Sequence, residues 1–246
     1  MYTFESRIRY SEVDGNGVLR LPSLIDYLQD CSTFQSEDVG YGVRWLIDRG
    51  YAWVVNAWQI EIAALPELGD RVTIGTCPYE IRGFLGLRNF FMLDAQGSYL
   101  VRANSVWTFL NMSTGMPERA PEEMKTAYGL GEKLEMTYLP RKLPFPQEGE
   151  TVSGGQLEVR AEHLDTNHHV NNGQYIRIAM DAAFGAETPR VRRVRAEYKK
   201  QAHLADLFYP LINRRTTEEG LLVTTALNDA DGAAYCTVEM TLEPSC

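Results

Sequence analysis

The chain has 246 residues, of which 44% are hydrophobic and 23% are charged, and its formal net charge is -9. This composition excludes a largely disordered chain, and the acidic balance makes nucleic acid a poor partner unless a local basic patch exists. The length accommodates one large domain or two domains of about 100 to 150 residues each.

The first residues, MYTFESRIRYSEVDG, contain no apolar segment of the kind found in secretory signals. No apolar run approaches the roughly 20 residues that a membrane span requires. Four scattered cysteines, without a CxxC pair, argue against a disulfide framework or a cysteine zinc site: Cys31, Cys77, Cys236 and Cys246. We therefore expect a cytoplasmic protein with reduced thiols and no membrane span.

The first half predicts a strand, a polar turn, a helix and then several strands. Leu21, Leu24, Ile25 and Leu28 recur at helical spacing and give one apolar stripe. Residues 51–62 and 71–81 are rich in β-branched and aromatic side chains, and residues 90–111 predict a hairpin that turns at 94–97.

The second half repeats this order after a poorly periodic stretch. Residues 125–156 carry three prolines and five glycines, so we place a linker at 126–152 between domains at 1–125 and 153–246. The next helix is predicted from the apolar residues Ile176, Ala179, Met180, Ala183 and Phe184. Strands are predicted at 191–200, 221–229 and 233–242, with a tight turn in NDADGA.

The two halves resemble each other, which indicates an internal duplication. RYSEVDGNGVLRLPSLIDYLQD (9–30) aligns with RAEHLDTNHHVNNGQYIRIAMD (160–181) at an offset of 151, which superimposes Asp14 on Asp165. Further matches follow in the same order, including Asp70 with Asp206 and LDAQG with NDADG. One helix against an antiparallel sheet, twice, predicts an α+β fold.

The most unusual stretch is HLDTNHHVNN, residues 163–172, which holds three of the four histidines: His163, His168 and His169. It has three interpretations. Asp, Thr and Asn are ordinary residues before a helix, so the turn could be structural. Imidazole and carboxylate groups could bind a metal, although adjacent histidines point apart and HExxH spacing is absent.

The third interpretation is acid–base hydrolysis of a thioester or ester. Histidine supplies a base near neutral pH, a carboxylate can orient it, and an amide with a helix N-terminus can stabilise an oxyanion. Asp165, Asn167 and His169 alternate along the turn and could share one side of it. No GxSxG or Cys–His signature indicates a covalent nucleophile.

LDTNHHVNNGQYI resembles the signature of acyl–acyl carrier protein (acyl-ACP) thioesterases, D-x-N-x-H-V-N-N-x-x-Y-I, a family of plants and bacteria. RANSVWTFLNMSTGMPERAPEEM (102–124) and EYKKQA (197–202) resemble further segments of that family. The resemblance implies a tandem double hotdog fold, each half a long helix on an antiparallel sheet. It implies hydrolysis of fatty acyl-ACP within fatty acid biosynthesis, with an acyl pocket shaped by the first hotdog and a catalytic second hotdog.

The resemblance places Asp165, Asn167, His169 and Gln201 in the catalytic site, with no cofactor and no metal. The plant motif ends in Glu-Cys, where this chain has Gln201 and Ala202. Ala202 has no thiol, and Gln201 can orient a water but cannot take its proton. The base is therefore His169 or Asp165.

A basic segment stands out in this acidic chain: Arg190, Arg192, Arg193, Arg195, Lys199 and Lys200. Acyl carrier proteins are acidic, so we expect part of this segment to dock the carrier, with a solvated strand face as the alternative. Two other functions remain open, an acyl-coenzyme A thioesterase and a non-catalytic acyl-binding hotdog. A monomer and a homodimer both fit a tandem hotdog.

Overall fold

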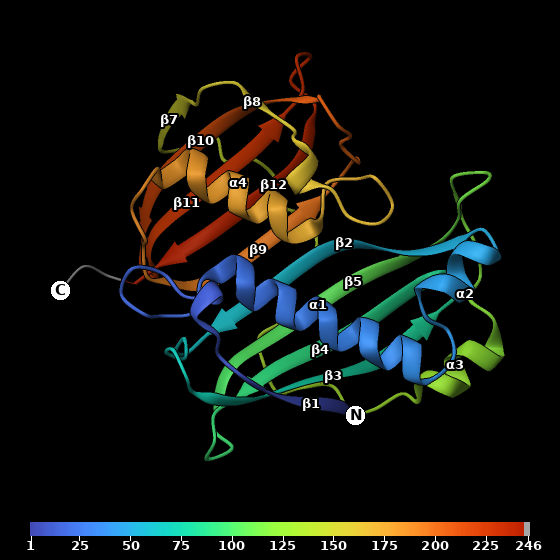
Figure 1. Ribbon diagram of the computed structural model, residues 1–246. Coiled ribbons are helices and arrows are strands. Elements are labelled where there is room, and N and C mark those ends of the chain that lie inside the picture. Colours follow the sequence, from blue (N-terminus) through green and yellow to red (C-terminus); the bar gives the residue numbers. More distant parts are fainter. Residues whose placement is uncertain (244–246) are drawn as a thin grey trace. The chain divides into compact units, whose positions relative to one another are not determined.

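The computed structural model describes residues 1–243, so Cys246 lies outside the described residues. The chain divides into two compact units, one formed by residues 1–56 and 60–138 and the other by residues 57–59 and 139 onward. Each unit carries one long helix on an antiparallel sheet (Figure 1). This confirms the predicted α+β class and the predicted tandem of two helix-on-sheet halves.

The first unit contains the sheet β1-β3-β4-β5-β2, with β6 paired to the outer part of β5. Pairing is antiparallel between β1 and β3, between β3 and β4, and between β4 and β5. In chain order the elements are β1 (Tyr2–Arg7), the 3₁₀ helix η1 (Tyr10–Glu12), α1 (Leu21–Asp38), α2 (Val43–Asp48), β2 (Tyr51–Ile62), β3 (Arg71–Arg82), β4 (Leu85–Leu93), β5 (Tyr99–Asn111), β6 (Met116–Pro117) and α3 (Glu122–Tyr128).

Helix α1 lies across this sheet and packs on β1 and β3 (Figure 1). Pro22 stands in its first turn, where a missing N–H costs nothing. Leu24, Ile25 and Leu28 are fully buried on the face toward the sheet, as their spacing predicts. The apolar stripe therefore fixes which side of the helix meets the strands.

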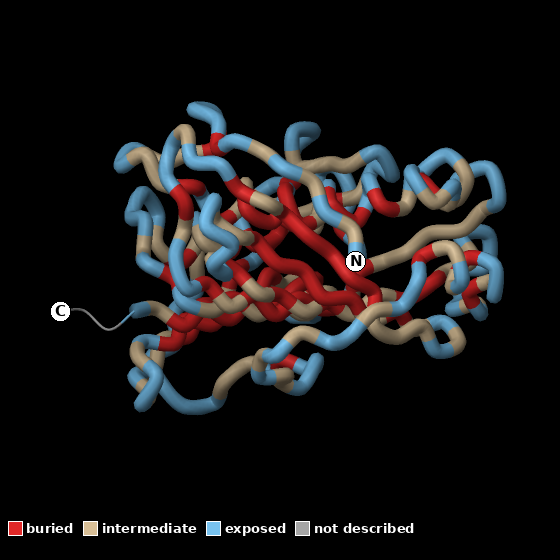
Figure 2. The backbone as a smooth tube through the Cα atoms, turned by 90° about the horizontal axis from the view of Figure 1, so that it is seen from below, coloured by how far each residue is buried: buried red, intermediate tan, exposed pale blue. Residues whose placement is uncertain are grey.

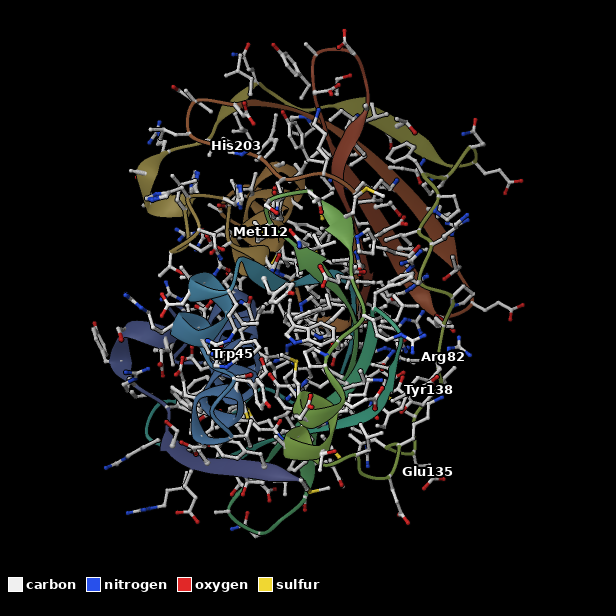
Figure 3. All side chains as sticks on the ribbon, turned by 90° about the vertical axis from the view of Figure 1, so that its right-hand side faces the viewer. Trp45, Arg82, Met112, Glu135, Tyr138 and His203 are labelled. Carbon is white, nitrogen blue, oxygen red and sulfur yellow. The ribbon has the colours of Figure 1, made fainter. Side chains whose placement is uncertain are left out.

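The opposite face of the first sheet is covered by the extended segment that follows α3. The Asn89 side chain on β4, fully buried, accepts hydrogen bonds from Leu134 N and Tyr138 OH, both at 3.0 Å. Gly131 N donates to Pro78 O at 2.9 Å. Tyr138, labelled in Figure 3, belongs to this covering segment.

The second unit contains the sheet β9-β12-β11-β10-β7, with β8 also paired to β10. Each neighbouring pair in this sheet is antiparallel: β9 with β12, β12 with β11, β11 with β10, and β10 with β7. In chain order the elements are β7 (Glu150–Ser153), β8 (Leu157–Glu158), the 3₁₀ helix η2 (Ala161–His163), α4 (Asn172–Phe184), β9 (Val191–Tyr198), β10 (Leu207–Thr217), β11 (Gly220–Asn228) and β12 (Ala234–Leu242).

Helix α4 packs on β10, β11 and β12 (Figure 1). Of the predicted apolar stripe, Ile176, Ala179 and Ala183 are buried on the inner face of the helix, whereas Met180 and Phe184 are half-buried. Gly185 ends the helix at a φ of 62°, in the left-handed region where glycine is the usual residue. The buried residues of both units concentrate in strands and inner helix faces, while turns are exposed (Figure 2).

Strand β10 was not predicted from the sequence, because Pro210 lies inside it. A proline has no N–H and is rarely found inside a paired strand. On the side of β10 away from β11, two short strands pair with it in succession. Phe208 pairs with Leu157 of β8 and Leu211 pairs with Ser153 of β7, so Pro210 lies between the two pairings. The missing N–H therefore falls at a gap in the ladder.

The stretch 126–152, expected as a linker, has neither helix nor strand over residues 129–149. Its first residues belong to the end of α3 and its last residues to β7.

Candidate functional site

The histidine-rich stretch forms a tight turn between η2 and α4. Asp165 N donates to His169 O at 2.8 Å, and His168 N donates to Asp165 O at 3.1 Å. The carboxylate oxygen Asp165 Oδ1 accepts from the N–H groups of Asn167 at 2.8 Å and His169 at 3.3 Å. The Asp165 side chain thus holds the backbone that presents the other two residues.

The matching turn of the first unit is held by the same four hydrogen bonds. Asp14 N donates to Val18 O at 2.8 Å, and Gly17 N donates to Asp14 O at 3.1 Å. Asp14 Oδ1 accepts from the N–H groups of Asn16 at 2.8 Å and Val18 at 3.1 Å. Because this copy has no histidine, the bonds made by Asp165 belong to the scaffold that both copies share.

His168 stands where the first turn has a glycine. Its φ is 61°, and Gly17 has a φ of 80°. A non-glycine residue pays a cost in this left-handed region of about 1 kcal/mol. The side chain of His168 is exposed. His168 therefore occupies the backbone position of a turn glycine and directs its imidazole into solvent.

His163 is used as a backbone cap. Its Nδ1 accepts from Arg160 N at 3.1 Å, and its own N–H donates to Arg160 O at 3.0 Å. In the first unit Glu12 makes the same pair of bonds with Arg9. Burial, the largest cause, lowers the pKa of His163, which matches the need for an unprotonated Nδ1.

The turn leads directly into α4. Asn171 Oδ1 accepts from Gly173 N at 2.8 Å and caps the helix. Asn167 lies four residues before Asn171, and its side chain is exposed. An exposed amide before a helix N-terminus can donate to a ligand oxygen.

A second segment, residues 199–206, is fastened to this turn at Ala202. Ala202 O accepts from Val170 N at 3.0 Å, and Ala202 N donates to Tyr175 OH at 2.8 Å. Ala202 is fully buried, so the position of the plant-type cysteine is closed by packing. Gln201, the residue before it, is exposed beside the turn.

The structure adds a residue that the sequence did not single out, His203. Its ring meets that of His169 edge-on, with centroids 4.8 Å apart and planes at 79°. His203 Nδ1 lies 3.8 Å from Asp206 Oδ2, and the same oxygen accepts from His203 N at 2.9 Å. His203 is labelled in Figure 3. The sequence offered one signal for His203 as a site residue: it is the fourth histidine of the chain and lies two residues after Gln201.

The environment of His169 favours its neutral form. Partial burial, the largest cause, and then the nearby His203 and the adjacent His168 lower the pKa of His169, while the Asp165 charge acts in the opposite direction. A neutral imidazole at pH 7 can accept a proton. The turn therefore contains an unprotonated imidazole at neutral pH.

The structure brings Asp165, Asn167 and His169 together in one turn and places Gln201 on the segment bonded to it. Within residues 1–243, no cluster of three or more His, Cys, Asp or Glu side chains is arranged to hold a metal ion. Over the same range, no helix is both long and apolar enough to cross a membrane.

The six basic residues of the segment lie on and around β9 in different settings. Arg195 is mostly buried, pairs with Glu239 at 2.8 Å and donates to Pro140 O at 2.9 Å. Arg193 forms an ion pair with Glu219. These two arginines are therefore already engaged by the unit itself.

The other four basic residues are exposed. Arg190 lies 3.9 Å from Glu243, and Lys199 lies 3.7 Å from Glu197. Arg192 donates to the backbone oxygen of Glu219 at 3.3 Å. Lys200 pairs with Asp229 and lies over the ring of Tyr235. Arg190 and Arg192 are the members best placed to meet an outside partner.

Two family models match the chain in order. The acyl-ACP thioesterase N-terminal domain matches residues 1–128, and the acyl-ACP thioesterase C-terminal domain matches residues 147–244. Together they cover both units.

Individual relatives are more distant. The chain is 25% identical to oleoyl-acyl carrier protein thioesterase 2 of Arabidopsis thaliana, over 90% of this chain and 65% of that protein. It is 27% identical to the acyl-[acyl-carrier-protein] hydrolase FATB2 of Cuphea viscosissima, over 69% of this chain and 44% of that protein. The chain thus spans less than two thirds of these relatives' length. The fold is shared with an acyl-ACP thioesterase structure from Bacteroides thetaiotaomicron, at a TM-score of 0.84 and 23% identity, covering 98% of this chain and 97% of that one.

Proposed function

The chain belongs to the acyl-ACP thioesterase family, and on this premise we propose that it hydrolyses fatty acyl-ACP to a free fatty acid and holo-ACP. The second unit carries the chemistry, and the first unit determines the acyl-chain preference. No cofactor takes part. The cytoplasmic location stays a prediction.

One observation carries this proposal. The two turns share four hydrogen bonds and an exposed asparagine, Asn16 or Asn167, but only the second turn adds an imidazole, His169, whose lowered pKa keeps it neutral. Folding of the turn does not require the imidazole, because the first turn forms the same bond from Val18 N to Asp14 Oδ1 with a valine at that position. Thioester hydrolysis needs both groups, a base for water and a donor for the carbonyl oxygen.

We assign the role of base to His169 and a scaffold role to Asp165. The carboxylate of Asp165 accepts two backbone N–H groups, and Asp14 does the same work in the copy without histidine. Hydrogen bonds from N–H groups stabilise a carboxylate and weaken it as a base. The pKa of His169 is lowered mainly by burial, which leaves its ring unprotonated and able to accept a proton at neutral pH.

The proposed reaction runs as follows. The amide of Asn167 donates to the thioester carbonyl oxygen, and the amide oxygen of Gln201 accepts a hydrogen bond from the attacking water. His169 takes a proton from that water as its oxygen bonds to the carbonyl carbon. The tetrahedral intermediate then breaks its C–S bond to release the fatty acid, and the thiolate takes the proton held by His169 to give the thiol of holo-ACP, which restores the neutral imidazole.

Alanine at either reacting position tests this assignment. Asn167→Ala and His169→Ala should each lower kcat/KM for acyl-ACP by about a hundredfold or more, because each removes a group that acts in the transition state. Steady-state hydrolysis of acyl-ACP, with thermal unfolding to confirm that the variants fold, gives the measurement. Near-normal turnover in both variants would refute the site.

The matched control is His168→Gly in the same turn. Glycine suits the left-handed φ of 61°, as Gly17 does in the first unit. This variant should keep activity close to that of the wild type. The same assay, run with acyl-coenzyme A of equal chain length, separates a carrier-protein thioesterase from a coenzyme A thioesterase, and binding without turnover would indicate an acyl-binding module.

A further inference from the structure

Among the described residues 1–243, His203 is the ring from outside the turn that packs on the proposed base. His169 is held by the backbone bond from its N–H to Asp165, and His203 is held by Asp206. Asp206 Oδ2 also accepts from Tyr235 OH at 3.3 Å, which fixes the carboxylate. The two segments are joined by the bond from Val170 N to Ala202 O, so the 4.8 Å ring separation is set by the backbone that carries both rings.

The first unit shows which part of this arrangement is scaffold. Glu67 N donates to Asp70 Oδ2 at 2.8 Å, and His203 N donates to Asp206 Oδ2 at 2.9 Å. The backbone loop is therefore common to both copies. The side chain differs, since the first unit has a glutamate where the second has an imidazole facing His169.

We propose that His203 is a positioning residue for His169, which fixes the plane of that ring and, as a neighbouring group able to carry positive charge, opposes its protonation. The proposal rests on the proposed function, in which His169 must be neutral. The side chain of His203 is 59% exposed, and Asp206 lies beside it. The neighbouring imidazole of His203 is, after burial, a cause of the lowered pKa of His169.

Other charged groups act on the pair as well. His169 is also influenced by the carboxylate of Asp165 and the imidazole of His168. His203 is also faced by Asp206, whose oxygen is bonded to the phenol of Tyr235. Neither aspartate is altered in the test below, so their influence stays constant.

His203→Phe separates charge from packing, because phenylalanine keeps an edge-on ring but cannot be protonated. We therefore expect the pKa of His169 to rise in His203→Phe, because the like-charge influence of His203 is removed while the ring contact is kept. NMR titration of the imidazole protons measures this directly, since the chain has only four histidines.

The titration needs no substrate, so it remains informative if the proposed activity fails. An unchanged His169 pKa in His203→Phe would overturn the proposal, and His168→Gly provides the matched histidine deletion, with a smaller expected shift. In the hydrolysis assay, the acid limb of kcat/KM for His203→Phe should move to higher pH together with the His169 pKa measured by NMR. His203→Ala should also lose several-fold in kcat at high pH, where the charge no longer matters, because the ring is unsupported.

Discussion

His163 and His169 are both more easily deprotonated in the folded chain, with burial the largest cause for each pKa shift. In the unfolded chain their pKa returns to about 6.5. As pH falls below that value, the unfolded chain takes up protons before the folded chain does. The stabilising contribution of both histidines is therefore complete above about pH 6.5 and is lost as pH falls further.

We expect the free energy of unfolding to decline between pH 7.5 and about pH 5.5, and His163→Gln to reduce that decline. A glutamine oxygen can accept from Arg160 N in place of Nδ1 but does not titrate. Urea unfolding at several pH values gives the measurement. An identical slope in wild type and variant would contradict the capping role of His163.

Among single residues, the sequence predicted the three members of the turn but not His203. Asp165, Asn167 and His169 lie within five positions, so their proximity follows from chain connectivity. His203 lies 34 positions beyond His169 (203 − 169), and its contact depends on the bond between Val170 and Ala202. Such a pairing is a property of the folded unit and has no local pattern.

At the scale of elements, the two homologous turns allow the effect of the aspartate on folding stability to be measured separately from its effect on hydrolysis. Asp14→Ala and Asp165→Ala each leave two backbone N–H groups without their partner and should each lower the free energy of unfolding by about 1 kcal/mol. Urea unfolding measures both. Similar losses in the two variants would support a common scaffold role.

Activity should distinguish the substitutions at Asp165. Asp165→Asn keeps a side-chain oxygen at Oδ1 for both N–H groups, so we expect it to retain most of the hydrolytic rate, whereas Asp165→Ala disturbs His169. A loss of about a hundredfold in Asp165→Asn would instead identify the carboxylate as the base.

The two long helices and most of the long strands were predicted, because apolar spacing fixes the face that each element buries, whereas the short helices α2 and α3 were not. Residues Leu24, Ile25 and Leu28 illustrate this for α1. Strand β10 was not, since Pro210 is acceptable only because β7 and β8 leave a gap beside it. That gap is made by residues more than 50 positions away and cannot be seen from local sequence.

For the whole molecule, the net charge of -9 opposes the approach of an acidic carrier protein. Exposed arginines near β9 could offset this locally. The double reversal Arg190→Glu with Arg192→Glu should raise KM for acyl-ACP about fivefold at low salt, because steering of an acidic partner is weakened. Hydrolysis of an acyl-pantetheine of the same chain length should be unaffected.

The control applies the same change of charge elsewhere. Arg44 and Arg82 of the first unit are 86% and 81% exposed, so Arg44→Glu with Arg82→Glu alters the net charge equally. This control should leave KM for acyl-ACP nearly unchanged. Equal effects in the two double variants would attribute the change to overall charge and argue against a docking face at β9.

The shared turn has a consequence for how related chains are interpreted. Because Asp14 and Asp165 make the same backbone bonds, selection for folding alone preserves the aspartate in a copy that has lost its activity. The imidazole at position 169 has no counterpart in the turn of the first unit, where Val18 stands. A descendant that became a pseudoenzyme would therefore keep Asp165 and lose His169, so the histidine is the informative marker of a working copy.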